Sequence, residues 1–413
     1  MNAIERCVYN AIKKNPVIKN FLVDVYQRIC AFVPVKNITN DYSICIRPGF
    51  FFGFHDKCPW SFDNHYLLAH RYNDHPLSMP RSNDVIDVGY FAGDNYRAYH
   101  CLGKTKAWNW QMGAMLQWVG DTHHIIFNDY DGEKNISRII DIHGKELRTF
   151  DLPIAAVSPN GKLALSHSFE RLRKGSYEYA YVNGVHEEEA DNVPESDGLT
   201  IFDLNSGSSR QLVRIKELYK KYHEPSMDGA YHFFSHCQFS PKSDRFMFYH
   251  RWKRPNQLLK TRMISYSIAS EKLHIFPTSG MVSHACWRDN EHILAYASTK
   301  SSGDKYYLFK DSTAKYSVIG ADQFKVDGHP QFSQDGRRIL TDTYPDRFRM
   351  QSLIVYNVKE NQLKIILKLR IPLKFRYGVR CDFHPRWNRD STMICFDSAH
   401  TGKRALCLLK YDD

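Results

Sequence analysis

The feature that most constrains the fold of this chain is a short pattern that recurs seven times after residue 50. Each copy is a β-rich run ending in an aromatic or apolar anchor residue, then a polar turn of Ser-Pro-Asp-Gly type, then a second β-rich run. The pattern is typical of a β-hairpin, which cannot bury its own faces and needs neighbours. The seven anchors are Trp60, Trp118, Val157, Phe239, Trp287, Phe332 and Trp387.

The spacing of these anchors predicts a β-propeller. Successive anchors lie 39 to 82 residues apart, which suits blades of four strands with insertions. We therefore predict an all-β fold, a seven-bladed β-propeller over residues 42–413. Little sequence follows the run Ala405–Leu409, so the last blade lacks a strand. We expect Tyr42–Arg47 to supply that strand, because closing the ring leaves no unpaired edge.

Residues 1–37 form a separate segment, predicted to be a short helical extension of the propeller. Asn15-Pro16 is typical of a helix start, and apolar residues then recur at helical spacing until Pro34. A shorter helix is expected over residues 3–14. The basic amphipathic pattern suits either an anionic membrane surface or packing against a protein partner. Two insertions, 170–198 and 211–235, are expected to cover a functional face, and the second contains the helix-like stretch 213–222.

Charge and cysteine usage narrow the classes of partner and the location. The formal net charge is +11, which favours acidic partners such as an anionic glycan or lipid. No run of like charges and no zinc-finger or RNA-recognition signature is present, so nucleic acid is disfavoured.

The ten cysteines show no CxxC spacing, and no apolar leader begins the chain. We predict a cytoplasmic protein, which the N-terminal helix could hold at the inner face of the membrane.

Histidines occupy one register in four consecutive blades. Counting back three residues from the anchor gives His236, His284, His329 and His384, whereas the first three blades carry Lys57, Met115 and Ile154 at that position. Equivalent positions of successive blades lie at equivalent heights around the propeller axis. The histidines should therefore converge, and imidazole suits both metal ligation and proton transfer near neutral pH.

Further polar residues are expected at the same end of the axis. Strand alternation places residues i and i+2 on one side, which brings in Gln238, Gln331 and Arg386. Residues at or just after the second strand of a blade should reach the same face. This group contains Arg71, His250, Arg251, Tyr344 and His400. Together they describe a polar funnel that suits an anionic sugar.

Three blade starts carry a family resemblance. Ser-His236-Cys-Gln-Phe-Ser-Pro, Ser-His284-Ala-Cys-Trp and Asp-Gly-His329-Pro-Gln-Phe-Ser resemble those of oligogalacturonate lyases. Members of that family are cytoplasmic seven-bladed propellers that cleave uronate-containing oligosaccharides by metal-dependent β-elimination. The resemblance implies that His236 is the base and that His284, His329 and His384 hold a divalent cation, manganese in that family. The family also uses a glutamine ligand, a role that we assign to Gln331.

The sequence departs from the family at its His-Pro-His-Pro run. Two segments of this chain could correspond to that run, Asp327-Gly-His329-Pro and Asp382-Phe-His384-Pro. In each of them an aspartate replaces the first histidine.

We predict a lyase that cleaves an acidic, uronate-containing oligo- or polysaccharide by metal-assisted β-elimination. The catalytic residues would be His236, Arg251 and Tyr344. The substrate-binding residues would be Lys57, Arg71, His250, Gln238, Arg386 and His400. The alternative is a non-catalytic propeller that binds glycan or protein during assembly of a cell-surface polysaccharide. A hydrolase that uses the same metal cluster remains a third possibility, because fold does not select function.

Overall fold

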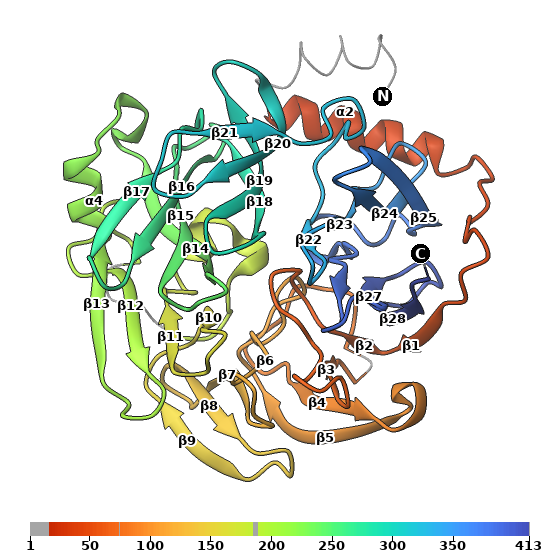
Figure 1. Ribbon diagram of the computed structural model, residues 1–413, viewed down its shortest axis with the longest axis horizontal. Coiled ribbons are helices and arrows are strands. Elements are labelled where there is room, and N and C mark those ends of the chain that lie inside the picture. The colour runs from red at the N-terminus through yellow and green to blue at the C-terminus, as the bar shows by residue number, and fades with distance from the viewer. Residues whose placement is uncertain (1–15, 74, 185–188, 413) are drawn as a thin grey trace.

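The computed structural model describes residues 16–73, 75–184 and 189–412 of the chain. Seven sheets of four antiparallel strands each surround a central axis (Figure 1). The seven-bladed propeller predicted from the hairpin repeats is therefore confirmed. The helix expected over residues 3–14 lies outside the described residues. In the part of the chain that the structure describes, no helix is long and apolar enough to cross a membrane.

The first four blades contain the strands in chain order from the axis outward. Blade 1 consists of β2 (Phe50–Phe51), β3 (Leu67–Arg71), β4 (Ile86–Ala92) and β5 (Ala98–Thr105). Blade 2 consists of β6 (Gln117–Trp118), β7 (Ile125–Tyr130), β8 (Asn135–Ile140) and β9 (Glu146–Phe150). Blade 3 consists of β10 (Ala156–Val157), β11 (Leu163–Ser166), β12 (Gly198–Asp203) and β13 (Ser209–Arg214). Blade 4 consists of β14 (Tyr231–Phe239), β15 (Arg245–Lys253), β16 (Lys260–Ser267) and β17 (Lys272–Ile275).

The last three blades follow the same order until the chain ends. Blade 5 consists of β18 (Val282–Trp287), β19 (His292–Thr299), β20 (Gly303–Lys310) and β21 (Tyr316–Val318). Blade 6 consists of β22 (Gln331–Phe332), β23 (Arg338–Asp342), β24 (Met350–Asn357) and β25 (Gln362–Arg370). Blade 7 consists of β26 (Arg386–Trp387), β27 (Met393–Ser398), β28 (Ala405–Lys410) and β1 (Cys45–Pro48).

The ring closes as the sequence predicts. β1 pairs antiparallel with β28, with Cys45 opposite Leu408 and Pro48 opposite Ala405. A buried carboxylate reinforces the junction between blades 7 and 1, because Asp397 accepts the backbone N–H groups of Phe52 and Gly53 at 3.0 Å each. Both ends of the propeller chain therefore share one blade, and β1 covers the edge that β28 would otherwise expose.

Helices are few and lie outside the blades. α2 (Pro16–Cys30) precedes the propeller and matches the predicted N-terminal helix. α3 (Leu172–Gly175) lies in the first insertion, and α4 (Ile215–Lys221) lies within the helix-like stretch of the second. The described residues also contain four short 3-10 turns: η1 (Asp94–Tyr96), η2 (Tyr177–Tyr179), η3 (Pro225–Met227) and η4 (Tyr377–Val379).

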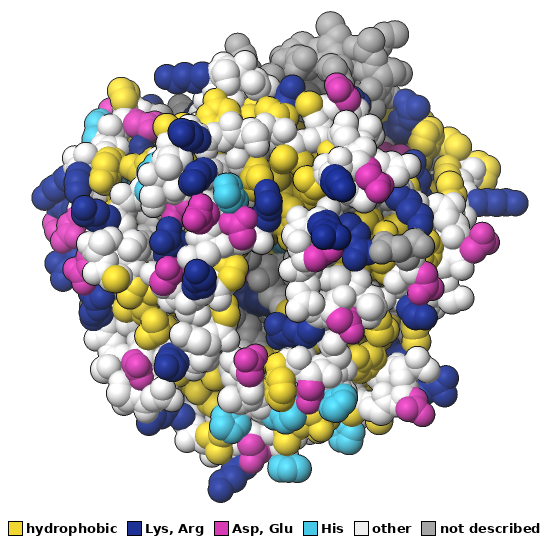
Figure 2. Space-filling model, viewed as in Figure 1, with side chains coloured by type: hydrophobic (Ala, Val, Ile, Leu, Met, Phe, Trp, Pro, Cys, Tyr) yellow, Lys and Arg dark blue, Asp and Glu magenta, His cyan; other side chains and the backbone are white. Residues whose placement is uncertain are grey.

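The excess of positive charge is spread over the visible surface and is not concentrated in one patch. Figure 2 shows Lys and Arg side chains distributed over many blades, interleaved with acidic side chains, on a face that is hollowed near its centre. A continuous basic stripe, the usual footprint of a nucleic-acid-binding protein, is not visible on this face.

Candidate active site at the propeller axis

The four histidines of the predicted register converge, and they surround a phenylalanine ring. The ring centroids of His329 lie 4.1 Å from His284 and 4.3 Å from His384. Phe54, on the loop after β2, lies 5.0 Å from both His236 and His384. All four histidines are buried. The convergence expected from the sequence is therefore present, with an apolar ring in the middle of the cluster.

Backbone irregularities turn these histidines toward the axis. The register of β14 shifts between Ser235 and Gln238, at His236, and that of β18 shifts between Val282 and Ala285. His236 and His384 adopt positive φ angles of 57° and 43°. β-Bulges and left-handed residues of this kind cost energy, and they re-aim side chains at the rims of sheets and at functional sites.

Three side chains form a candidate metal site. One ligand atom each from His329, Asp382 and His384 lies within 4.8 Å of the others, and all three residues are buried. The Nε2 atoms of both histidines and Oδ1 of Asp382 have no hydrogen-bond partner. Buried polar atoms are normally satisfied, so three unpartnered polar atoms on residues this close together fit the binding of a cation. Two imidazoles and a carboxylate suit manganese, iron or zinc.

Asp342, at the end of β23, holds both histidines of this site. Its Oδ1 atom accepts Nδ1–H of His329 at 2.8 Å, and its Oδ2 atom accepts the backbone N–H of His384 at 3.2 Å. A carboxylate on Nδ1 fixes the tautomer that leaves Nε2 free for a metal, the usual arrangement around metal-binding histidines. Burial alone would lower the pKa of His329, but the neighbouring carboxylates, Asp342 foremost, raise it above its ordinary value.

Asp382 belongs to the candidate metal site and also pairs with the Arg380 guanidinium. Its Oδ2 atom accepts Nε–H of Arg380 at 2.7 Å, while Oδ1 remains unpartnered. Arg380 also donates to the hydroxyl of Tyr179 at 3.0 Å. Burial and the neighbouring His329 hold the pKa of His384 well below its ordinary value, so His384 is neutral and its electron pair is available.

His284 adjoins the candidate metal site but is anchored differently. Its Nδ1 atom lies 3.2 Å from Oδ1 of Asp327, and the Tyr344 hydroxyl faces its Nε2 atom at 3.5 Å. Burial and the nearby His329 lower the pKa of His284, although Asp327 opposes this shift. A neutral imidazole that a carboxylate orients through Nδ1 has the arrangement of a general base.

His236 lies on the other side of Phe54. Its ring stacks on Tyr249 at 5.2 Å and meets Tyr179 edge-on at 5.3 Å. Its Nδ1 atom has no partner, and burial followed by the charge of Arg251 holds its pKa well below the ordinary value. His236 is therefore also neutral, but no carboxylate orients it through Nδ1.

Arg251 is a buried cation near His236. Its guanidinium lies 5.1 Å from the centre of the Tyr249 ring, and its Nε atom has no hydrogen-bond partner. Burial lowers the pKa of Arg251, because the charged guanidinium loses the water around it. A buried guanidinium of this kind is a ready receptor for a carboxylate.

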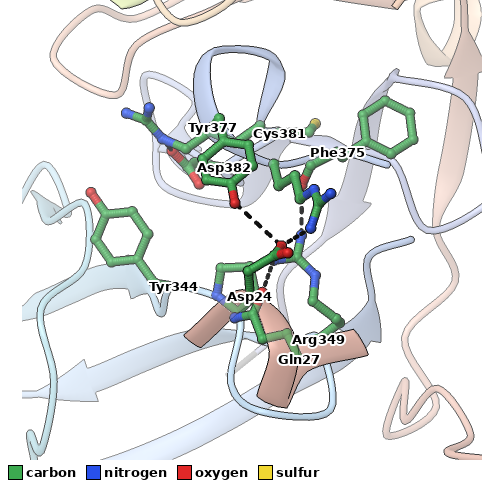
Figure 3. Close-up of a pocket in the computed structure, with 11 residues that line it drawn as sticks. Asp24, Gln27, Tyr344, Arg349, Phe375, Tyr377, Cys381 and Asp382 are labelled. Carbon is green, nitrogen blue, oxygen red and sulfur yellow. Dashed lines mark hydrogen bonds and ion pairs between the residues drawn. The ribbon is translucent and has the colours of Figure 1, made fainter. Parts of the chain in front are cut away.

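A cavity of about 250 Å³ reaches this site from the side of α2. Tyr344 and Asp382 line one side of it, and Asp24 and Gln27 of α2 line the opposite side (Figure 3). Arg380 is also among the lining residues. The Tyr377 hydroxyl donates to Asp24 at 3.2 Å across the cavity. The cavity therefore connects the orphaned carboxylate of Asp382 with the N-terminal helix.

A second, larger cavity of about 650 Å³ opens at the other end of the axis, and it contains three of the predicted site residues. Lys57, Gln238 and Gln331 line it together with His55, which lies between this cavity and the histidine cluster. Gln331 accepts the backbone N–H of Trp387 at 2.6 Å, and Gln238 accepts that of Trp287 at 3.2 Å. These glutamines tie each inner strand to the next blade. The side-chain oxygen of Gln331 is thus engaged by Trp387, and the assignment of Gln331 as a metal ligand stays a prediction.

The remaining predicted residues have other partners. Arg71 forms a 2.6 Å ion pair with Asp87 of β4, and Nε2 of His250 lies 2.9 Å from Nδ1 of His232. Arg386 is fully buried and pairs with Asp397 while it donates to the carbonyl groups of Gly53 and Phe54. His400 contacts the Ser398 hydroxyl at 2.9 Å. None of these four contacts involves the histidine cluster.

Sequence reasoning missed Phe54 and His55 as contributors to the site. It expected Asp342 and Asp382 near the axis but did not predict that Asp342 holds the histidines or that Asp382 is a candidate ligand. His55 lies 5.4 Å from His329, although it stands five residues before its anchor rather than three, so the register count overlooked it. The aspartate that replaces a histidine in Asp382-Phe-His384-Pro was the available signal for the carboxylate ligand.

Comparisons with known proteins agree on the fold. No protein-family model and no curated protein matches the sequence. Among solved structures, the chain is similar to an oligogalacturonate lyase in complex with manganese, with 16% identity, a TM-score of 0.64, and coverage of 92% of this chain and 98% of the other. An oligogalacturonate lyase from Vibrio parahaemolyticus gives 12% identity, a TM-score of 0.61, and coverage of 92% and 99%.

The class that fold and site define is a seven-bladed β-propeller with a histidine-rich axial site. Within that class, the chain is similar in fold to oligogalacturonate lyases over nearly its whole length, as its blade-start motifs predict. At these identities the likeness establishes the fold and leaves the activity to be argued from the site.

Proposed function

We propose that this protein is a lyase that cleaves an acidic, uronate-containing oligo- or polysaccharide by metal-assisted β-elimination. The observation that carries the proposal is the set of three orphaned, buried ligand atoms on His329, Asp382 and His384. The manganese named for the similar lyase structure supports a divalent cation in a propeller of this fold. When bound, such a cation supplies positive charge that stabilises a substrate carboxylate as it becomes enediolate-like.

This chain's own residues supply the rest of the reaction. Arg251 is placed to hold a substrate carboxylate, since it is a buried cation with an unpartnered Nε atom. The base takes the proton from the carbon next to that carboxylate, the electron pair forms a carbon–carbon double bond, and the bond to the β-oxygen breaks. Tyr344 is placed to protonate the leaving oxygen, because burial raises its pKa well above the ordinary value and keeps its proton on.

Two histidines compete for the role of base. The family resemblance favours His236, and that assignment stays a prediction. The geometry favours His284, because Asp327 orients its Nδ1 atom while its Nε2 atom faces Tyr344 beside the candidate metal site. We propose His284 as the base and His236 as a wall of the substrate pocket.

The test is ultraviolet absorbance of the 4,5-unsaturated product over a panel of acidic glycans with added Mn²⁺, Ca²⁺ or Zn²⁺. We expect absorbance to rise with one uronate-containing glycan and a chelator to abolish it. Met115→Leu in blade 2 is the control, since Met115 occupies the same register within an apolar core. If no glycan gives the absorbance in any metal, the lyase proposal is wrong.

One observation favours the non-catalytic alternative. Phe54 occupies the centre of the histidine cluster, and His329, His384 and Asp382 are each no more than 2% exposed. A glycan-binding propeller with a structural metal would show the same burial. Glycan binding without product formation, unaffected by metal removal, would support this second function.

The proposed location is cytoplasmic. Nine cysteines lie within the described residues, and all are free thiols. Reduced, mostly buried cysteines are usual in a reducing compartment, which supports the proposal.

A further inference from the structure

The N-terminal helix α2 carries most of its apolar side chains on the side away from the propeller. Phe21 is 66% exposed, Ile29 is 63% exposed, and Phe32, just beyond the helix end, is 90% exposed. Leu22 and Val25 lie on the same face and are also exposed. Of the large apolar side chains that are exposed in the described part of the chain, half fall within residues 21–38. Such a concentration marks an interaction surface rather than ordinary scatter.

The opposite side of α2 is bound to the propeller through polar groups. Asp24 pairs with Arg376, and Gln27 accepts from Arg349 at 3.4 Å. Arg370 donates to the carbonyl of Ala31 just after the helix. These contacts fix the rotation of α2 on the rim of the propeller beside blade 6 (Figure 1). The apolar face therefore cannot turn inward without breaking them.

Charge around this face selects the partner. Arg28 on α2 is exposed next to the apolar arc, Lys36 is exposed just beyond the helix, and Lys374 is exposed in the loop that contacts α2. An apolar helix face flanked by cations, on a protein of net charge +11, is complementary to an anionic bilayer surface.

We propose that α2 docks this protein on an anionic lipid membrane, with Phe21, Leu22, Val25, Ile29 and Phe32 inserted at the headgroup boundary. The helix lies in the interface and does not cross the bilayer. The inference does not depend on the proposed lyase activity. Because Asp24 and Gln27 of the same helix line the cavity that reaches Asp382, docking would place that cavity beside the lipid surface.

The experiment is co-sedimentation of the full chain with phosphatidylcholine vesicles, with and without phosphatidylglycerol. We expect binding to the anionic vesicles only, weakened by added salt. The double variant Ile29→Asn, Phe32→Ser should reduce the partition coefficient at least about tenfold, since full burial of one such side chain is worth about a factor of ten or more. Lys36→Glu with Lys374→Glu should reduce it as well.

The matched control is Leu258→Ser, because Leu258 is 55% exposed on the loop between β15 and β16, on a different blade. It should leave vesicle binding unchanged. The proposal is overturned if the full chain binds no vesicle, or if the control weakens binding as much as the double variant. It is also overturned if the double variant instead dissociates a dimer in gel filtration, or only lowers the melting temperature, since the face would then be covered by a second copy or by this chain itself.

Discussion

The segments just before the inner strands of blade 2 and blade 7 carry different side chains at one register position. Met115 and His384 both stand three residues before their anchors and share a left-handed backbone, with φ angles of 54° and 43°. Met115 packs into an apolar core with Phe54. His384 contacts the same Phe54 ring but presents an unpartnered Nε2 atom to His329 and Asp382. The fold sets the position and the backbone strain, and the side chain decides whether the position packs or binds.

The largest expected effect comes from removing a candidate metal ligand of blade 7. We expect Asp382→Ala to lose the bound divalent cation and turnover together, with metal affinity falling by more than about 100-fold, because even outer partners of metal ligands are worth about 10–100-fold. Metal content by mass spectrometry and the absorbance assay check this result. Met115→Leu should retain both, and equal losses in the two variants would break the comparison.

The next effect separates the two candidate bases. His284→Ala should keep the metal but lower turnover by about 10²–10⁴-fold, as expected for loss of a positioned general base. Asp327→Asn should lower turnover in the same direction while retaining the fold, because it removes the carboxylate that orients Nδ1 of His284. If His236→Ala produces the loss of turnover and His284→Ala releases the metal, the assignment made from the family resemblance is right and ours is wrong.

A smaller effect is expected from Asp342, which supports the ligands without belonging to the group of three. Asp342→Asn should weaken metal affinity by about 10–100-fold, since the carboxylate fixes the tautomer of His329. Isothermal titration of the metal-free protein with Mn²⁺ measures the change. Unaltered affinity would mean that the bond between Asp342 and His329 serves the fold alone.

The smallest expected effect concerns the glutamines that link the inner strand of one blade to the next blade. Gln331→Ala should destabilise the protein by about 1–3 kcal/mol, because the buried backbone N–H of Trp387 loses its acceptor. Gln117→Ala in blade 2 should cost a similar amount, since Gln117 accepts the N–H of Val157 in the same way. Denaturant unfolding measures both. Loss of metal from the Gln331 variant, but not from the Gln117 variant, would restore Gln331 as a ligand.

The sequence could predict the N-terminal helix and the convergence of the histidines, for two different reasons. The spacing of apolar residues up to Phe32 predicted α2, because a helix is a local structure. The convergence of His284, His329 and His384 was also predictable, since repeats in a closed ring bring equivalent positions together. Lys57 and Gln331 could not be placed, because Lys57 lies in a loop beyond β2 and β22 begins only at Gln331, so strand alternation does not govern where these side chains point.

The sequence by itself determined the number of blades, the strand that closes the ring and the register that carries the histidines, because these follow from a local pattern repeated seven times. Only the tertiary structure decided which ligand atoms meet. His329, Asp382 and His384 come from two blades and face one another because Asp342 and Arg380 hold them there. Such contacts depend on bulges and on side chains from different blades, and a repeat pattern contains no information about either.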